Sequence, residues 1–196
     1  MTRALPCLVL SACIPVLTSP GSDDSGSGGG VWASPENSWI NTAPPASLEG
    51  EGWGEGDVVP DARFVDQNGD EVALWQFYGQ VIALDVSTIW CAPCRELATH
   101  VDETWLDYVD QDFMYLTLLG EDTHGDIPDV DALVTWATDY GITAPVLTDP
   151  DQHVYDIVPD GTYPRVVIIN RDLVVVEDQV NPVDDATIRS AIEAAL

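Results

Sequence analysis

The stretch from Val81 to Val86 is almost continuously apolar, and Asp85 is its one charged member. Such a run is typical of a strand that is buried on both faces of a sheet. Apolar residues then recur at helical spacing, which predicts a helix from about Ala92 to Asp110. The run from Phe113 to Leu119 is the next predicted buried strand. A strand, a helix and a strand in this order predict parallel pairing and a covered sheet.

Turn and period signals predict the other elements of one domain, which begins near Asp57 and runs to residue 196. Asn68-Gly69 separates two short strand-like runs and predicts a hairpin at the start of the domain. Further elements are expected in this order: a helix over residues 130–140, a short strand at 145–147, a brief helix near Tyr155, a hairpin of strands 165–169 and 173–177, and a final helix capped by Asp184 or Asp185.

The charge of the chain limits its partners. The sequence has 34 acidic and 6 basic residues, a formal net charge of −28. Such a surface repels nucleic acid and anionic lipid, so we expect no nucleic-acid partner. The acidity suits a high-salt or extracellular setting, and a source genome that prefers Asp, Glu and Arg explains it equally well.

The first residues have the order of a secretory signal. Arg3 gives a basic start, an apolar run begins at Ala4, and small residues precede Cys13. The run is too short to span a bilayer. Leu10-Ser-Ala-Cys13 resembles the lipobox of bacterial lipoproteins, which implies a signal peptide over residues 1–12 and a lipid on Cys13 that anchors the protein to a membrane. An ordinary cleaved signal, with an incidental cysteine, is the alternative.

Residues 13–56 are predicted to be a flexible linker that follows the lipidated cysteine. They are rich in Gly, Ser, Pro and acidic residues and have no sustained period. Trp32, Trp39 and Trp53 are unusual in such a segment. They are either sporadic aromatics or residues that dock on the domain or on a partner.

The number and positions of the cysteines limit the chemical roles that they can have. Of the four cysteines, Cys7 would leave with the signal and Cys13 would carry lipid, so the mature domain would keep Cys91 and Cys94. A single pair of cysteines so close together in sequence cannot form the network of structural disulfides that stabilises many small secreted domains. The pair is therefore a redox couple, half of a metal site, or a local disulfide without chemistry.

The position of this pair favours redox chemistry. Cys91 lies where the predicted buried strand gives way to the predicted helix, whose first turn has unpaired N–H groups and the positive end of the dipole. These groups stabilise a thiolate and lower the pKa of Cys91. Cys94 lies one turn further into the helix, and Pro93 suits a first turn.

Three separated motifs carry a family resemblance. Trp90-Cys-Ala-Pro-Cys94-Arg95 resembles the active-site motif of thioredoxins. The first part of the domain resembles the membrane-tethered periplasmic thioredoxins of the TlpA, ResA and CcmG type, to which the peroxiredoxin-related redoxins are related. The residues that carry this resemblance are Pro60-Asp61, the turn 66–69, Val72-x-Leu74 and Gly79-x-Val81. The segment 161–170 resembles the one that holds this family's cis-proline. The resemblance covers residues 57–196.

The resemblance implies a fold and a set of roles. The fold would be a thioredoxin-like α/β fold of three layers, a central mixed sheet flanked by helices, with an N-terminal β-hairpin and a helical insertion. Cys91 would attack a substrate disulfide and Cys94 would resolve the mixed disulfide. Pro164 would be the cis-proline that faces the pair, and Trp90 and Tyr163 would contact the substrate.

Asp85 falls at the position of the buried thioredoxin aspartate. Burial would raise its pKa, which makes it a candidate base for Cys94. A solvated strand end is the alternative. The chain departs from the family at Leu97, where many tethered thioredoxins have Glu, at Tyr163, which is bulkier than usual, and in the turn 170–173. These departures leave the substrate open.

We therefore predict a thiol–disulfide oxidoreductase that needs no cofactor other than the Cys91–Cys94 disulfide. It would be an exported monomer, lipid-anchored on the periplasmic or cell-surface side of an envelope membrane. Because Ala92-Pro93 brings no histidine or extra cation to the thiolate, the pair is expected to be reducing. Its partners would be exported protein disulfides and a membrane electron donor.

Two other functions remain as alternatives. Thr88-Ile-Trp-Cys91 matches the Thr-x-x-Cys of peroxiredoxins, although the proline expected seven residues before the cysteine is Leu84. A metal-binding or copper-delivery module would need further soft or imidazole ligands. The sequence offers His100, His124 and His153 for that purpose, and each is also explained as a surface residue.

Overall fold

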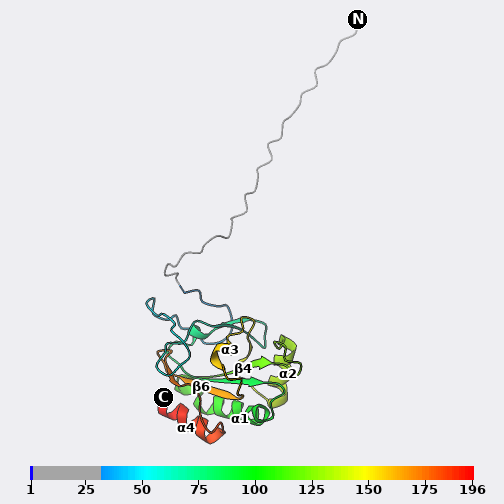
Figure 1. The fold of residues 1–196 in the computed structure, drawn as a ribbon. Coiled ribbons are helices and arrows are strands. Elements are labelled where there is room, and N and C mark those ends of the chain that lie inside the picture. The colour runs from blue at the N-terminus through cyan, green and yellow to red at the C-terminus, as the bar shows by residue number, and fades with distance from the viewer. Residues whose placement is uncertain (2–31) are drawn as a thin grey trace. The chain divides into compact units, whose positions relative to one another are not determined.

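The computed structural model describes residue 1 and residues 32–196. The predicted signal peptide, Cys13 and the first part of the predicted linker lie outside the described residues. A compact unit extends to Leu196 and contains all the helices and strands described below. Figure 1 shows that the strands form one sheet with helices on both faces.

The sheet has seven strands in the order β2-β1-β5-β4-β3-β6-β7. β3, β4 and β5 are parallel, whereas β1 and β2 at one edge and β6 and β7 at the other pair antiparallel. The strands are β1 Arg63–Asp66, β2 Glu71–Ala73, β3 Val81–Thr88, β4 Phe113–Glu121, β5 Val146–Thr148, β6 Arg165–Ile169 and β7 Val175–Glu177. The mixed α/β sheet confirms the predicted fold class.

The central strands are buried on both faces, as their apolar runs predict. Every residue of β3 is buried, and so is every residue of β4 up to Gly120. The helices are α1 Ala92–Tyr108, α2 Val130–Tyr140, α3 Val154–Ile157 and α4 Asp185–Ala195, with short 3-10 turns η1 Leu74–Gln76 and η2 Val109–Gln111. Asp129 caps α2 and Asp184 caps α4, each by accepting a backbone N–H with its side chain.

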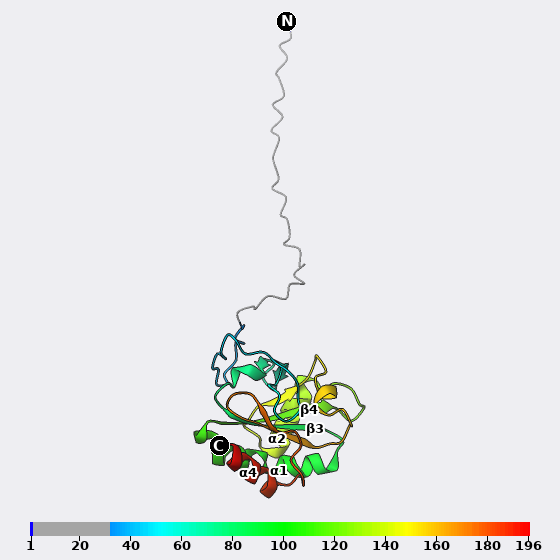
Figure 2. The same cartoon turned by 60° about the vertical axis from the view of Figure 1, so that its left-hand side comes forward.

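Two apolar clusters lie on opposite faces of the sheet. Alternate residues of β3 belong to different clusters, because successive side chains of a strand point to opposite faces. The first cluster includes buried residues of α1, α2 and α4, and the second includes α3 and the N-terminal hairpin. In Figure 2 α1 and α4 lie together below the strands, as they do in Figure 1.

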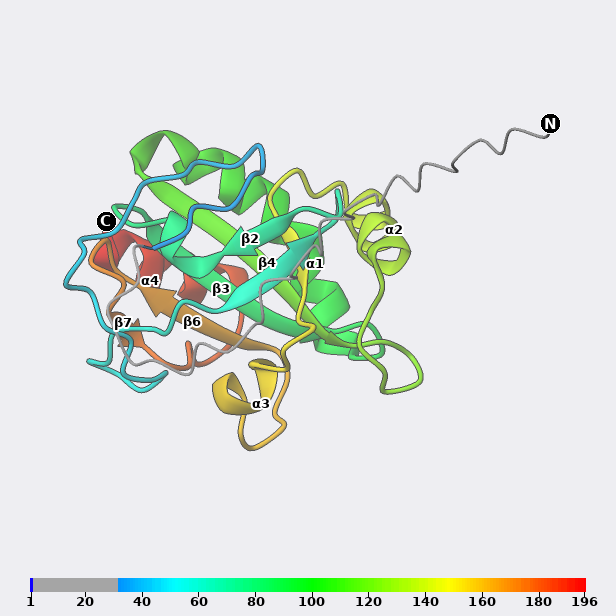
Figure 3. The same cartoon turned by 90° about the horizontal axis from the view of Figure 1, so that it is seen from above.

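Residues 32–56, the described part of the predicted linker, run against the second face. The Nε1 of Trp32 donates to Asp61 and that of Trp39 to the buried Asp66. Trp39 and Trp53 also pack against the second apolar cluster. Docking on the domain is therefore the alternative that the structure supports for these tryptophans, and Figure 3 shows the blue and cyan segment beside β2.

In the described part of the chain, no helix has both the length and the apolar character that a membrane span requires.

Candidate active site

Cys91 and Cys94 lie where the buried strand β3 turns into α1. Cys91 is the N-cap of α1, and its Sγ accepts the backbone N–H of Cys94 at 3.3 Å. Pro93 occupies the first turn of the helix, where a missing N–H breaks no hydrogen bond. The junction therefore has the geometry that the sequence predicts. When Cys91 is a thiolate, the same N–H group and the helix dipole stabilise its charge.

The two cysteines form a disulfide bond. Cys91 is 4% exposed and Cys94 is completely buried, so an incoming thiol or thiolate reaches Cys91 first. This asymmetry distinguishes an attacked sulfur from a resolving one, because thiol–disulfide exchange depends on which sulfur is accessible.

Asp85 is a buried carboxylate on the face of β3 that α1 covers. Successive side chains of β3 point to opposite faces of the sheet, and those of Ile82, Leu84 and Val86 belong to the second cluster. The Asp85 side chain therefore points to the other face, the one that carries Val81, Ala83 and the two cysteines. The Asp85 side chain accepts one hydrogen bond, from the Ser87 hydroxyl at 2.7 Å. Burial raises the pKa of Asp85 to about 7, and the Ser87 hydrogen bond opposes this shift. The side chain can therefore gain or lose a proton near neutral pH.

Other polar groups line the same face beside Asp85. Thr117 of β4 lies directly opposite Asp85 in the parallel register, and Tyr115 is two residues before it. Among the described residues, neither the Thr117 hydroxyl nor the Tyr115 hydroxyl has a hydrogen-bond partner. Burial, together with the nearby charge of Asp85, raises the pKa of Tyr115, so this hydroxyl stays protonated. The sequence pattern does not reveal these hydroxyls, because the spacing of polar residues inside an apolar run does not show which groups will lie beside them.

An aromatic pair borders the cysteines. Trp90 is half exposed, and its Nε1 donates to Glu121 at 2.9 Å. Its ring meets Tyr163 edge to face, with 6.2 Å between ring centroids. The peptide bond between Tyr163 and Pro164 is cis, as the resemblance implies. Because Val86 pairs with Arg165, Pro164 lies beside the end of β3, next to the junction that carries the cysteines.

The candidate metal ligands are not gathered into a site. Among residues 32–196, no group of three or more His, Cys, Asp and Glu side chains is arranged to hold a metal ion. His124 contacts Asp122, and the ring of His153 meets Phe64 edge to face at 5.9 Å. The two side chains thus have structural contacts of their own.

Comparison with known proteins places this site in a family context. The profile of the AhpC/TSA family matches residues 56–178. The thiol-disulfide oxidoreductase ResA of Bacillus thuringiensis (strain Al Hakam) is 25% identical over 122 residues, which make up 62% of this chain and 67% of that protein.

Two solved structures show the same fold. The thioredoxin domain of a thiol-disulfide oxidoreductase from Bacteroides vulgatus has a TM-score of 0.60 and 16% identity, over 72% of this chain and 96% of that one. A secreted Mycobacterium tuberculosis disulfide oxidoreductase, described as homologous to the Escherichia coli protein DsbE, has a TM-score of 0.56 and 15% identity, over 68% and 96%.

Proposed function

Because the chain belongs to the AhpC/TSA family, and carries its cysteine pair at the start of a helix, we propose that it is a thiol–disulfide oxidoreductase that reduces disulfides of exported proteins. The observation that carries this proposal is the Cys91–Cys94 disulfide at the N-cap of α1, with one sulfur reachable and the other buried. Its similarity to an oxidoreductase over 122 residues supports the same activity.

The proposed reaction transfers two electrons and two protons. In the reduced protein the Cys91 thiolate attacks one sulfur of the substrate disulfide; a bond forms between them, and the other substrate sulfur leaves as a thiolate and takes up a proton. Cys94 then loses its proton and attacks the Sγ of Cys91, which releases the first substrate sulfur as a thiol. The substrate is reduced, and Cys91 and Cys94 are oxidised to their disulfide.

Asp85 is the proposed base for the second step. It lies on the same face as Cys94 and its pKa of about 7 suits proton transfer at neutral pH. It would accept the Cys94 proton directly or through a water molecule. Trp90, Tyr163 and Pro164 would contact the substrate segment that carries the disulfide.

The cellular setting is part of the proposal. A lipid on Cys13 would hold the protein on an envelope membrane, and a membrane-bound dithiol donor would return the Cys91–Cys94 disulfide to the reduced state. Labelled palmitate tests the anchor: we expect incorporation into the wild type and its loss in Cys13→Ala. Equal labelling of both proteins, or of neither, would contradict the anchor.

The test of the activity is to trap its substrates. In Cys94→Ala the mixed disulfide on Cys91 cannot be resolved, so we expect covalent adducts with exported proteins that a reducing agent releases. The matched control is Cys91→Ser combined with Cys94→Ala, which has no attacking sulfur. Equal adduct formation by both proteins would refute exchange at Cys91.

A further inference from the structure

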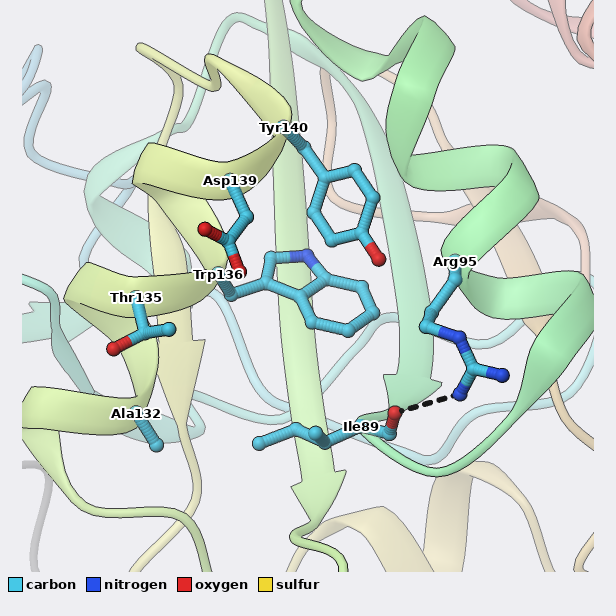
Figure 4. A pocket seen from close by; sticks show the side chains of 7 residues that line it. All are labelled: Ile89, Arg95, Ala132, Thr135, Trp136, Asp139 and Tyr140. Carbon is cyan, nitrogen blue, oxygen red and sulfur yellow. Dashed lines mark hydrogen bonds between the residues drawn. The ribbon is translucent and has the colours of Figure 1, made fainter.

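A pocket of about 360 Å³ lies beside the cysteine junction, between the start of α1 and helix α2 (Figure 4). Ile89 and Arg95 line it on the side of the junction, and Thr135, Trp136, Asp139 and Tyr140 line it on the side of α2. Ile89 lies two residues before Cys91 and Arg95 four residues after it, in the first turns of α1. A polypeptide whose disulfide is bound at Cys91 therefore passes next to this pocket.

Arg95 supplies the pocket with a positive charge. One of its guanidinium N–H groups donates to the carbonyl of Ile89 at 3.0 Å. Within the described region it forms no ion pair, whereas Arg63, Arg165 and Arg189 each pair with carboxylates. An Arg side chain has five N–H donors, so most of them remain available to a ligand.

The floor of the pocket is aromatic. Trp136 is 4% exposed, and its ring lies 4.7 Å from that of Tyr140 between centroids. The indole Nε1 of Trp136 is buried and has no acceptor among the described residues. Because this nitrogen is buried, the part of Trp136 that can meet a ligand is the apolar surface of its ring.

The charges in the pocket are separated. Asp139 also lines it, but Figure 4 shows Trp136 between Asp139 and Arg95. On a chain with a net charge of −28, most of the surface repels acidic groups. An acidic side chain is therefore attracted at Arg95 and repelled by most of the remaining surface. This repulsion adds to the specificity that the contact with Arg95 gives.

We propose that the Arg95–Trp136 pocket is a specificity site that binds a carboxylate side chain of the protein substrate, close in sequence to the substrate cysteine. The carboxylate pairs with Arg95, and the aliphatic part of the side chain covers Trp136. Glutamate, with its longer stem, fits better than aspartate. This inference rests on the proposed exchange activity and names the class of substrate segment that the same site prefers.

The test compares three synthetic peptides that differ in charge. Each has one cysteine held as a mixed disulfide with 2-mercaptoethanol, and the residue two or three positions from the cysteine is Glu, Gln or Lys. The second-order rate constant for reduction by the reduced protein is measured for each peptide. The ratio of the Glu rate to the Lys rate is the readout, because any effect of Arg95 on the Cys91 thiolate changes both rates equally.

Two pairs of variants separate pocket binding from other causes. Arg95→Gln removes the cation, and Gln111→Glu, beyond the other end of α1, gives the same change in net charge. Thr135→Tyr fills the pocket without a change in charge, and Val134→Tyr adds the same ring to the neighbouring exposed position outside the pocket.

We expect a Glu-to-Lys ratio of about five to ten for the wild type, a size typical of a partly solvated charge-assisted hydrogen bond. Arg95→Gln and Thr135→Tyr should lower this ratio to one or below, because the remaining surface favours the Lys peptide, and Gln111→Glu and Val134→Tyr should leave it as in the wild type. A wild-type ratio near one, or a ratio that Arg95→Gln does not change, would overturn the pocket while leaving the exchange activity intact. Failure to reduce any of the three peptides would instead contradict the proposed function.

Discussion

Asp85 is an acidic residue in a buried environment that disfavours its charged form. A carboxylate that is 1% exposed and holds one hydrogen bond, from Ser87, is costly to ionise. The sequence already indicates this residue, because it interrupts an apolar run. Spacing alone could not indicate that Ser87 would be its partner or that Thr117 would lie opposite.

The pKa of Asp85 predicts how stability depends on pH. The folded pKa of about 7 lies above the unfolded value near 4, so the unfolded chain releases this proton first as pH rises. The contribution of Asp85 to stability is therefore full at low pH and is lost as pH rises through 7. Asp85→Asn removes this dependence. From pH 5 to 8.5, the free energy of unfolding of the variant should rise relative to wild type by roughly 3 kcal/mol.

Denaturant unfolding of the oxidised proteins across this pH range checks the prediction. Asp151→Asn, at an exposed position, corrects for the loss of one negative charge. A constant difference between Asp85→Asn and wild type at all pH values would show that Asp85 does not titrate in this range.

The sequence predicts the roles of some residues of the site and not those of others. Cys91 and Cys94 are defined by their spacing and by the strand–helix junction. The role of Pro164 comes from resemblance, since no periodicity reveals which proline faces the cysteines. Arg95 and Trp136 were not predicted as a pair, because a pocket between two helices depends on how the helices pack.

At the scale of elements, hydrophobic periodicity predicts the strands and the helix of the core, but it does not predict the contacts of the N-terminal segment. The runs at 81–86 and 113–119 become β3 and β4, and the helical spacing after Cys91 becomes α1 with a 3-10 turn at its end. Residues 32–56 have no period, yet they contact the domain through single aromatic side chains and hydrogen bonds. Contacts of this kind leave no repeating signal in a sequence.

The contact between Trp39 and Asp66 should make this segment part of the stable domain. Asp66 is fully buried and accepts the Trp39 Nε1–H at 2.7 Å, together with backbone donors of the hairpin turn. Trp39→Phe removes one donor to a buried carboxylate and should lower the free energy of unfolding by about 1–2 kcal/mol.

Trp90→Phe is the matched control for this measurement. Trp90 also donates to a carboxylate, that of Glu121, but at an exposed position, so its loss should change stability by less than about 0.5 kcal/mol. Equal stability of Trp39→Phe and wild type in denaturant unfolding would mean that the segment does not stabilise the domain.

At the scale of the whole molecule, the net charge of −28 acts against the compact state. Charges repel over a Debye length of about 30 Å at 0.01 M salt, and this falls to about 3 Å at 1 M. The melting temperature should therefore rise between these salt concentrations. Choline chloride should act as sodium chloride does if screening is the cause, and a melting temperature that is flat in both salts would contradict this account.

The fold class follows from the sequence at this scale, because buried parallel strands joined by a helix allow few arrangements. The choice of oxidant for the cysteine pair does not follow from the fold. The AhpC/TSA family match and the Thr88-x-x-Cys91 motif leave peroxide as the competing oxidant, and a buried second sulfur one turn away favours a disulfide.

A direct comparison of the rates with these two oxidants tests the central claim. The reduced protein is mixed with either a peptide disulfide or hydrogen peroxide at equal concentration, and formation of the Cys91–Cys94 disulfide is followed by quenching with an alkylating agent and mass measurement. The proposed function predicts that the peptide disulfide oxidises the pair faster and yields one reduced peptide disulfide per protein. Peroxide consumption that outpaces disulfide reduction would contradict it and identify a thiol peroxidase.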